Sequence, residues 1–196
     1  MKLLKLTIMK KIIFTIALFS ICTISAKAFI MPIGAGPIHK EVIPYVSDNS
    51  FPKVKGMNLE GEEKILPQDL KAPTNIVIVA FKREQQADVD TWIKALNPIL
   101  ESNTNLALYE IPTLKKFNFL MRYNINNGMR YGIPDKKARE RTICVYLDKP
   151  SFRKKLAIEN EDQIVVFVID QKGIIKTKIL GIATPKSLNI IKTFLK

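Results

Sequence analysis

The chain has 196 residues and a formal net charge of +13, with 47% of its residues hydrophobic and 25% charged. A chain of this length and composition is expected to fold as one globular domain with an adequate core. Its lone histidine, His39, has no cysteine or acidic cluster nearby, which excludes a transition-metal site, and no nucleotide-binding or Ser-His-Asp motif is present. No cofactor is therefore predicted.

Residues 1–28 have the pattern of a secretory signal peptide. A basic region without acids precedes an apolar stretch at 12–25, and Ala26-Lys27-Ala28 fits a cleavage site. The apolar stretch is shorter than the roughly 20 residues of a transmembrane helix. We expect export, with cleavage after Ala28 and a periplasmic or secreted location; a retained membrane anchor is the alternative.

The chain after residue 28 keeps a net charge of +8, because the signal contains five of the 31 basic residues and none of the 18 acidic ones. Cys144 is its only cysteine, so it can form neither an internal disulfide nor a Cys-x-x-Cys pair. Cys144 lies between Ile143 and Val145 in an apolar run, and free cysteine is among the most buried residue types. We therefore predict a buried, unreactive thiol.

The residues after the signal alternate between predicted strands and helices. An irregular arm at 29–50, with scattered Pro and Gly, precedes them. The predicted elements are a hairpin at 53–66 turning at Glu60-Gly61, a strand at 76–81 leading directly into a helix at 84–101 with Trp92 in the core, a strand at 105–111, a helix at 113–126, a strand at 142–147, a short helix at 150–157, a hairpin at 163–180 and a final helix from Thr184. Pro112 is expected to end its strand, and 128–141 to be a connection. This order predicts an α/β fold, a mixed sheet with helices on both faces and an N-terminal β-hairpin.

Short motifs add a resemblance to a known superfamily. They are Gly56-x-x-Leu59-x-Gly61 before the first core strand, Ile169-Asp170-x-x-Gly173 in the final hairpin and Gly181-Ile182-x-Thr184-Pro185 before the last helix. Together with the element order, they resemble the thioredoxin-like superfamily, most closely its peroxiredoxin and cytochrome-maturation branch. The stretches AFKREQQADVDTW and YEIPTL look like a cysteine-lacking group that includes mitochondrial ATP-synthase assembly factors and uncharacterised exported bacterial relatives. The resemblance implies a thioredoxin-like domain at 51–196.

The same resemblance indicates where redox chemistry has been lost. Thioredoxin-like proteins place a reactive cysteine where a strand runs into a helix, because the helix N-terminus stabilises a thiolate. In this chain the cysteine pair of the superfamily would fall at or next to Gln85 and Asp88. The cis-proline that precedes the penultimate strand in the superfamily is also absent from 158–163. We expect neither disulfide exchange nor peroxidase activity.

The turn that replaces the redox site is a candidate partner-binding surface. Its polar residues are Arg83, Glu84, Gln85, Gln86 and Asp88. Glu84 and Asp88 are four residues apart and share a helix face near the positive end of the helix dipole. They are either ordinary stabilising residues of a first helical turn or part of a recognition surface, and the sequence leaves both open.

A basic segment at 115–141 is the second candidate. It carries a net charge of +6, most of the charge of the processed chain. Its candidate binding residues are Arg130, Lys136, Lys137, Arg139 and Arg141. The segment is either a surface for anionic lipid headgroups or an acidic protein, or a solvated face. Nucleic acid is not expected as a partner, since the chain is exported and has no basic motif interleaved with aromatic residues.

These observations favour an exported, non-redox thioredoxin-like protein that binds a protein partner of the cell envelope. It would assist assembly or folding of an envelope or membrane component. The alternative is an enzyme in which Arg83, Glu84 and the arginines of the basic segment act on a small anionic substrate. Convergence of these residues in one concave pocket would favour the enzyme, whereas a spread over a convex surface would favour binding. The sequence names neither the partner nor the oligomeric state.

Overall fold

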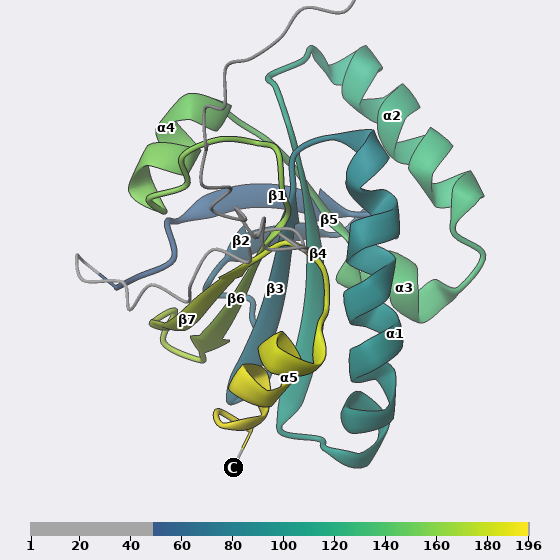
Figure 1. The fold of residues 1–196 in the computed structure, drawn as a ribbon. Coiled ribbons are helices and arrows are strands. Elements are labelled where there is room, and N and C mark those ends of the chain that lie inside the picture. The colour runs from purple at the N-terminus through teal and green to yellow at the C-terminus, as the bar shows by residue number, and fades with distance from the viewer. Residues whose placement is uncertain (1–48, 196) are drawn as a thin grey trace, which may run out of the picture. The chain divides into compact units, whose positions relative to one another are not determined.

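The computed structural model describes residues 49–195, which form an α/β domain around a single mixed sheet (Figure 1). The seven strands follow the order β2-β1-β5-β4-β3-β6-β7. The elements are β1 (Val54–Asn58), β2 (Glu63–Leu66), β3 (Thr74–Ala80), η1 (Arg83–Gln85), α1 (Gln86–Ser102), β4 (Leu106–Leu114), α2 (Phe119–Gly132), α3 (Lys136–Arg141), β5 (Ile143–Tyr146), α4 (Lys149–Lys155), β6 (Val165–Asp170), β7 (Ile175–Leu180) and α5 (Pro185–Lys192). Within residues 49–195 no helix is both long and apolar enough to cross a bilayer. The predicted signal peptide and nearly all of the predicted arm lie outside the described residues.

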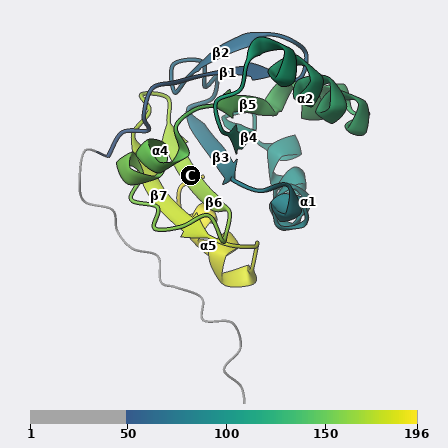
Figure 2. The same ribbon diagram turned by 90° about the horizontal axis from the view of Figure 1, so that it is seen from above.

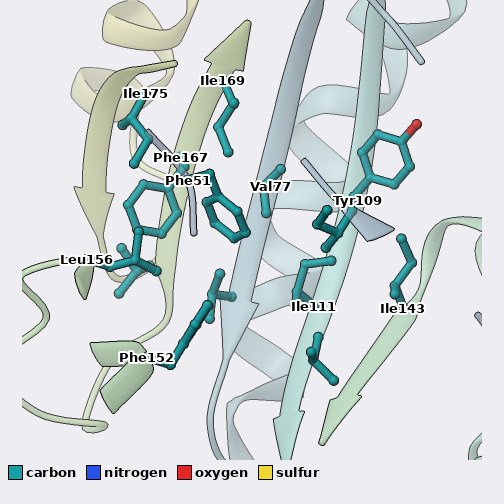
Figure 3. Packing of buried hydrophobic residues seen from close by; sticks show 14 of the residues in the cluster. Phe51, Val77, Tyr109, Ile111, Ile143, Phe152, Leu156, Phe167, Ile169 and Ile175 are labelled. Atoms are coloured by element: carbon teal, nitrogen blue, oxygen red, sulfur yellow. The ribbon is translucent and has the colours of Figure 1, made fainter. Parts of the chain in front are cut away.

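Strand β3 is buried on both faces, which explains the uninterrupted apolar sequence of residues 76–80. It runs parallel to β4 and antiparallel to β6. Ile76 belongs to the core cluster on one face, together with Trp92 of α1 and Ile191 of α5. Val77 belongs to the cluster on the opposite face, shown in Figure 3, to which α4 contributes Phe152. The prediction of helices on both faces of a mixed sheet is therefore confirmed (Figure 2).

The first sequence motif builds the hairpin of β1 and β2. Gly56 allows β1 to approach β5 closely, because a Cβ at this position would lie 2.7 Å from Cγ2 of Ile143. Leu59 is buried, and Gly61 has a φ of +88° in the turn, where an L side chain would be strained. The predicted hairpin is confirmed.

Two side chains shape the C-terminal half. The Asp170 carboxylate accepts the backbone N–H groups of Lys172 and Ile174, each at 2.9 Å, and so closes the turn between β6 and β7. The Thr184 hydroxyl accepts the N–H of Ser187 at 3.1 Å and caps α5, which has a proline in its first turn. The final hairpin and helix agree with the prediction.

Helix α1 is fastened to the sheet through Trp92, which is fully buried as predicted. The indole Nε1 donates a hydrogen bond to the carbonyl of Gly181 at 2.8 Å. One residue earlier, the Thr91 hydroxyl accepts the N–H of Ala183 at 3.0 Å. These bonds join α1 to the loop between β7 and α5.

The expectations for the middle of the chain are wrong in two places. Strand β4 does not end at Pro112 but continues to Leu114, because its last two residues pair with β5. The following helix therefore starts later, at Phe119, where the Asn118 side chain accepts the N–H of Met121 at 2.9 Å.

The second error concerns 128–141, which was expected to be a connection. It contains the end of α2 and all of the short helix α3. The Asp135 carboxylate caps α3 by accepting the N–H of Ala138 at 2.8 Å. The glycines and charges that favoured a loop are placed within these helices and their caps.

Candidate recognition site at the start of helix α1

Gln85 occupies the N-cap position of α1, shortly after the end of β3. Its side chain is only 5% exposed. The amide oxygen Oε1 accepts the backbone N–H of Phe81 at 2.8 Å and that of Lys82 at 3.2 Å. The amide Nε2 donates to the carbonyl of Glu161 at 2.7 Å. One side chain therefore joins the end of β3 to the loop that precedes β6.

Three charged side chains reinforce the same junction. Lys149 of α4 donates from Nζ to the carbonyl of Phe81 at 2.9 Å and to the carboxylate of Glu161 at 2.7 Å. The other oxygen of this carboxylate lies 3.3 Å from Nε of Arg153, which also belongs to α4. We call Gln85, Lys149 and Glu161 the closed junction. It fills the place where the resemblance puts a redox site, and none of its side chains is a thiol.

The polar residues around Gln85 face solvent. Arg83, Glu84 and Gln86 are exposed, and Asp88 is partly exposed. Gln86 donates from Nε2 to the Asp90 carboxylate at 3.0 Å. The candidate turn is thus an exposed polar surface built around one buried amide.

Cys144 lies within β5 rather than at the start of a helix, and it is fully buried. Its Sγ is 3.7 Å from Sδ of Met129. Burial, with a smaller contribution from the charge of Glu110, raises the pKa of the thiol to about 12. The predicted burial is confirmed, and a thiol of this pKa has little thiolate at neutral pH.

The candidate residues of the basic segment have different surroundings. Arg139 forms an ion pair with Glu60 and donates from Nη1 to the carbonyls of Ile133, at 2.9 Å, and Pro134, at 2.6 Å. Arg130 lies 3.5 Å from the same Glu60 carboxylate. The hydrogen bond from Arg139 holds the pKa of Glu60 below its usual value. Glu60 thereby joins the β1–β2 turn to α2 and to α3.

Lys136, Lys137 and Arg141 complete the set. Lys136 is exposed, with its Nζ 3.7 Å from the carboxylate of Glu140. Lys137 is exposed, whereas Arg141 is half-buried. The candidates therefore include two exposed lysines and three arginines that lie close to acidic side chains.

The sequence reasoning missed Glu110, a carboxylate on β4 with 5% exposure. Burial raises its pKa, while the charge of Arg141 and a hydrogen bond with Gln86 act in the opposite direction. Glu110 thus lies close to both α3 and the start of α1. Its signal in the sequence is a lone acid within the apolar run NLALYEI.

A cavity of about 690 Å³ lies between α2 and the strands β1 and β5. Its lining includes Met57, Phe119, Tyr123 and Tyr146, and the basic side chains Lys55, Arg122 and Arg130. No residue of the turn 82–90 lines it, nor does Arg139 or Arg141. The arginines of the basic segment therefore do not converge with the turn in this cavity.

No protein family matches the sequence. No curated protein matches it either. Solved structures do match the fold. A thiol:disulfide interchange protein from Bacteroides sp. has a TM-score of 0.53 and 14% identity, over 78% of this chain and 92% of that one.

Two further structures are similar. The thioredoxin domain of a thiol-disulfide oxidoreductase from Bacteroides vulgatus has a TM-score of 0.50 and 14% identity, over 78% of this chain and 99% of its own. An exposed lipoprotein thioredoxin from Streptococcus pneumoniae has a TM-score of 0.50 and 9% identity, over 74% and 100%. At these identities the similarity establishes the fold alone, and the domain has a thioredoxin-like fold.

Proposed function

We propose that this chain is an exported, non-redox thioredoxin-like protein that binds a protein of the cell envelope and assists its assembly or folding. The observation that carries the proposal is the closed junction. The similar structures are named as thiol-disulfide oxidoreductases, whereas this chain has a buried glutamine at the start of α1 and its one thiol after residue 28 in the core. Binding is the function that a thioredoxin-like domain retains without that chemistry.

The partner surface in this proposal is the exposed turn that surrounds Gln85. Arg83, Glu84, Gln86 and Asp88 contact the partner, and Gln85 holds their backbone in place from below. Lys136 and Lys137 extend the surface as exposed charges. Arg130, Arg139 and Arg141 contribute positive potential next to their acidic neighbours. The resemblance of 80–92 to cysteine-lacking assembly factors supports an assembly role over a catalytic one.

Export and processing are part of the proposal. The signal pattern predicts that the mature chain begins at Phe29. N-terminal sequencing of the protein from the envelope fraction tests this. A full-length species that resists carbonate extraction would instead identify a retained anchor.

The direct test of function compares a triple variant of the turn with a triple variant further along α1. The turn variant carries Arg83→Ala, Glu84→Ala and Asp88→Ala. The control variant alters three exposed residues of α1 with Lys94→Ala, Asn97→Ala and Glu101→Ala. We expect the first variant to stay folded, to lose its envelope partner in an affinity pull-down and to fail to complement a deletion strain. The control should retain both properties. A turn variant that keeps its partner and complements fully would refute this surface.

A further inference from the structure

Helix α2 exposes an unusual amount of apolar surface. None of its fourteen residues is buried. Of the seven large hydrophobic side chains that are exposed among residues 49–195, five belong to α2: Phe119, Leu120, Met121, Tyr123 and Tyr131. Phe119 is 82% exposed and Tyr131 is 87% exposed. Exposed apolar side chains gathered on one helix in this way indicate a candidate site of interaction.

The way α2 is held explains why its apolar residues are free. The described contacts with the sheet include a hydrogen bond from Tyr146 Oη to Asn126 at 2.7 Å, and the Arg122 guanidinium lies 5.1 Å from the Tyr146 ring centre. Phe119 and Tyr123 line the cavity between α2 and the strands β1 and β5. These polar contacts and the contact of Met129 with Cys144 position α2, and its aromatic side chains remain exposed.

The segment that contains α2 carries charges of one sign, although Arg130 in its last turn also pairs with Glu60 of the β1–β2 turn. The stretch from Lys115 to Pro134 contains four basic residues and no Asp or Glu. Lys115 and Lys116, just before the helix, are exposed, and Lys115 Nζ lies 5.3 Å from the ring centre of Phe117. Arg130, in the last turn, is also exposed. A partner that complements this surface is anionic and offers an apolar layer directly below its charges.

We propose that α2 docks in the plane of an anionic bilayer. Phe119, Leu120 and Tyr123 enter the boundary between headgroups and acyl chains, and Lys115 and Lys116 contact the anionic headgroups. An interfacial helix combines apolar and basic residues in this way. Tyrosine suits the boundary because lipid covers its ring while water reaches its hydroxyl, and phenylalanine and leucine supply the apolar face. The inference is independent of partner binding at the turn 82–90, since lipid vesicles contain no protein.

Phe119→Trp is the reporter for the test. Trp92 is the only native tryptophan and is fully buried, so its emission is a constant background. The variant, made in the chain as it is recovered from an exporting host, is mixed with vesicles of phosphatidylglycerol or of phosphatidylcholine. We expect a blue shift and higher emission with phosphatidylglycerol only, with an effect that weakens as salt rises. A reporter at 119 responds to α2 itself, so a retained leader would not mimic the result.

Matched variants locate the binding on α2. Leu120→Glu should reduce cosedimentation with phosphatidylglycerol vesicles by about tenfold or more, while Ile182→Glu, the same kind of change at another exposed apolar residue, should not. The double variant Lys115→Glu with Lys116→Glu should also reduce this cosedimentation. Lys154→Glu with Lys172→Glu changes the net charge equally and should not. An unshifted Phe119→Trp spectrum, equal binding to both lipids, or equal losses in test and control variants would overturn the proposal. A blue shift of the Phe119→Trp emission that appears with envelope proteins and not with lipid would overturn the membrane proposal in favour of a protein partner.

Discussion

At the start of α1 the side chain of Gln85 is buried and makes three hydrogen bonds, whereas none of the fourteen residues of α2 is buried. The first region uses polar atoms to close a junction between β3, α4 and the loop before β6. The second leaves large apolar side chains in solvent. The difference shows that one domain can bury polar side chains where it enters a helix and leave large apolar side chains exposed on another helix.

Two aromatic residues on these helices should give the largest contrast in stability. Trp92→Ala removes a fully buried indole and its bond to Gly181, and we expect it to cost roughly 3–5 kcal/mol in the free energy of unfolding. Phe119→Ala removes a ring that is mostly in water and should change the free energy of unfolding by less than about 0.5 kcal/mol. Denaturant titrations of the two variants measure both values. A large loss for Phe119→Ala would show that α2 is packed after all.

The closed junction makes the second prediction. Gln85→Ala leaves the buried N–H of Phe81 and the carbonyl of Glu161 without their partner, and should cost about 1–3 kcal/mol. Gln68→Ala is the matched control, because Gln68 is an exposed glutamine outside this junction. Equal, small effects for both variants in denaturant titration would contradict the structural role of Gln85.

A pH effect is expected at Glu110, below the start of α1. Burial raises the pKa of Glu110, so the folded state holds this proton more tightly than the unfolded state does. The stability from this group is present at low pH and is lost as pH rises through the raised pKa. Glu110→Gln should therefore gain stability relative to the wild type between pH 4.5, the ordinary pKa, and neutrality.

Removal of the opposing charge gives the control for this effect. Arg141 favours the ionised carboxylate of Glu110. The Arg141→Ala variant should therefore lose more stability than the wild type does as pH rises. Thermal unfolding at a series of pH values measures both variants. A constant difference between Glu110→Gln and the wild type across this range would show that Glu110 does not titrate as described.

The smallest effect is a chemical one. Cys144 should not react with a thiol reagent in the folded protein, because burial raises its pKa to about 12, and it should react fully once the protein is unfolded. Asp88→Cys places a partly exposed thiol in the first turn of α1 and should react rapidly. Fast labelling of Cys144 in the native state would contradict this assignment.

The elements built from local apolar periodicity could be predicted from the sequence, whereas those set by distant pairing could not. The run 76–79 and the α1 face around Trp92 indicated their strand and helix, and Gly61 marked its turn. Pro112 is a local signal for a strand end, but pairing with β5, whose residues lie more than 30 positions along the chain, keeps β4 extended.

The candidate site divides in the same way. Its position at the start of α1 followed from the strand that runs into a helix. The burial of Gln85 did not, because its partner Glu161 is 76 residues away in the sequence. Glu110 was missed for the same reason, since α3 and α1 surround it only in the folded chain. The exposure of α2 was also hidden, because its apolar spacing is typical of a packed helix.

Native-state hydrogen exchange compares the closed junction with α2 most directly. We predict that the amide of Phe81 exchanges only through global unfolding, because Gln85 accepts its hydrogen bond in a buried place. The amides of α2 from Met121 onward should exchange through local opening, at a clearly lower free energy. Gln85→Ala should lower the protection of Phe81 and leave that of α2 unchanged. Equal protection of Phe81 and α2, or loss of protection in both on Gln85→Ala, would contradict the account.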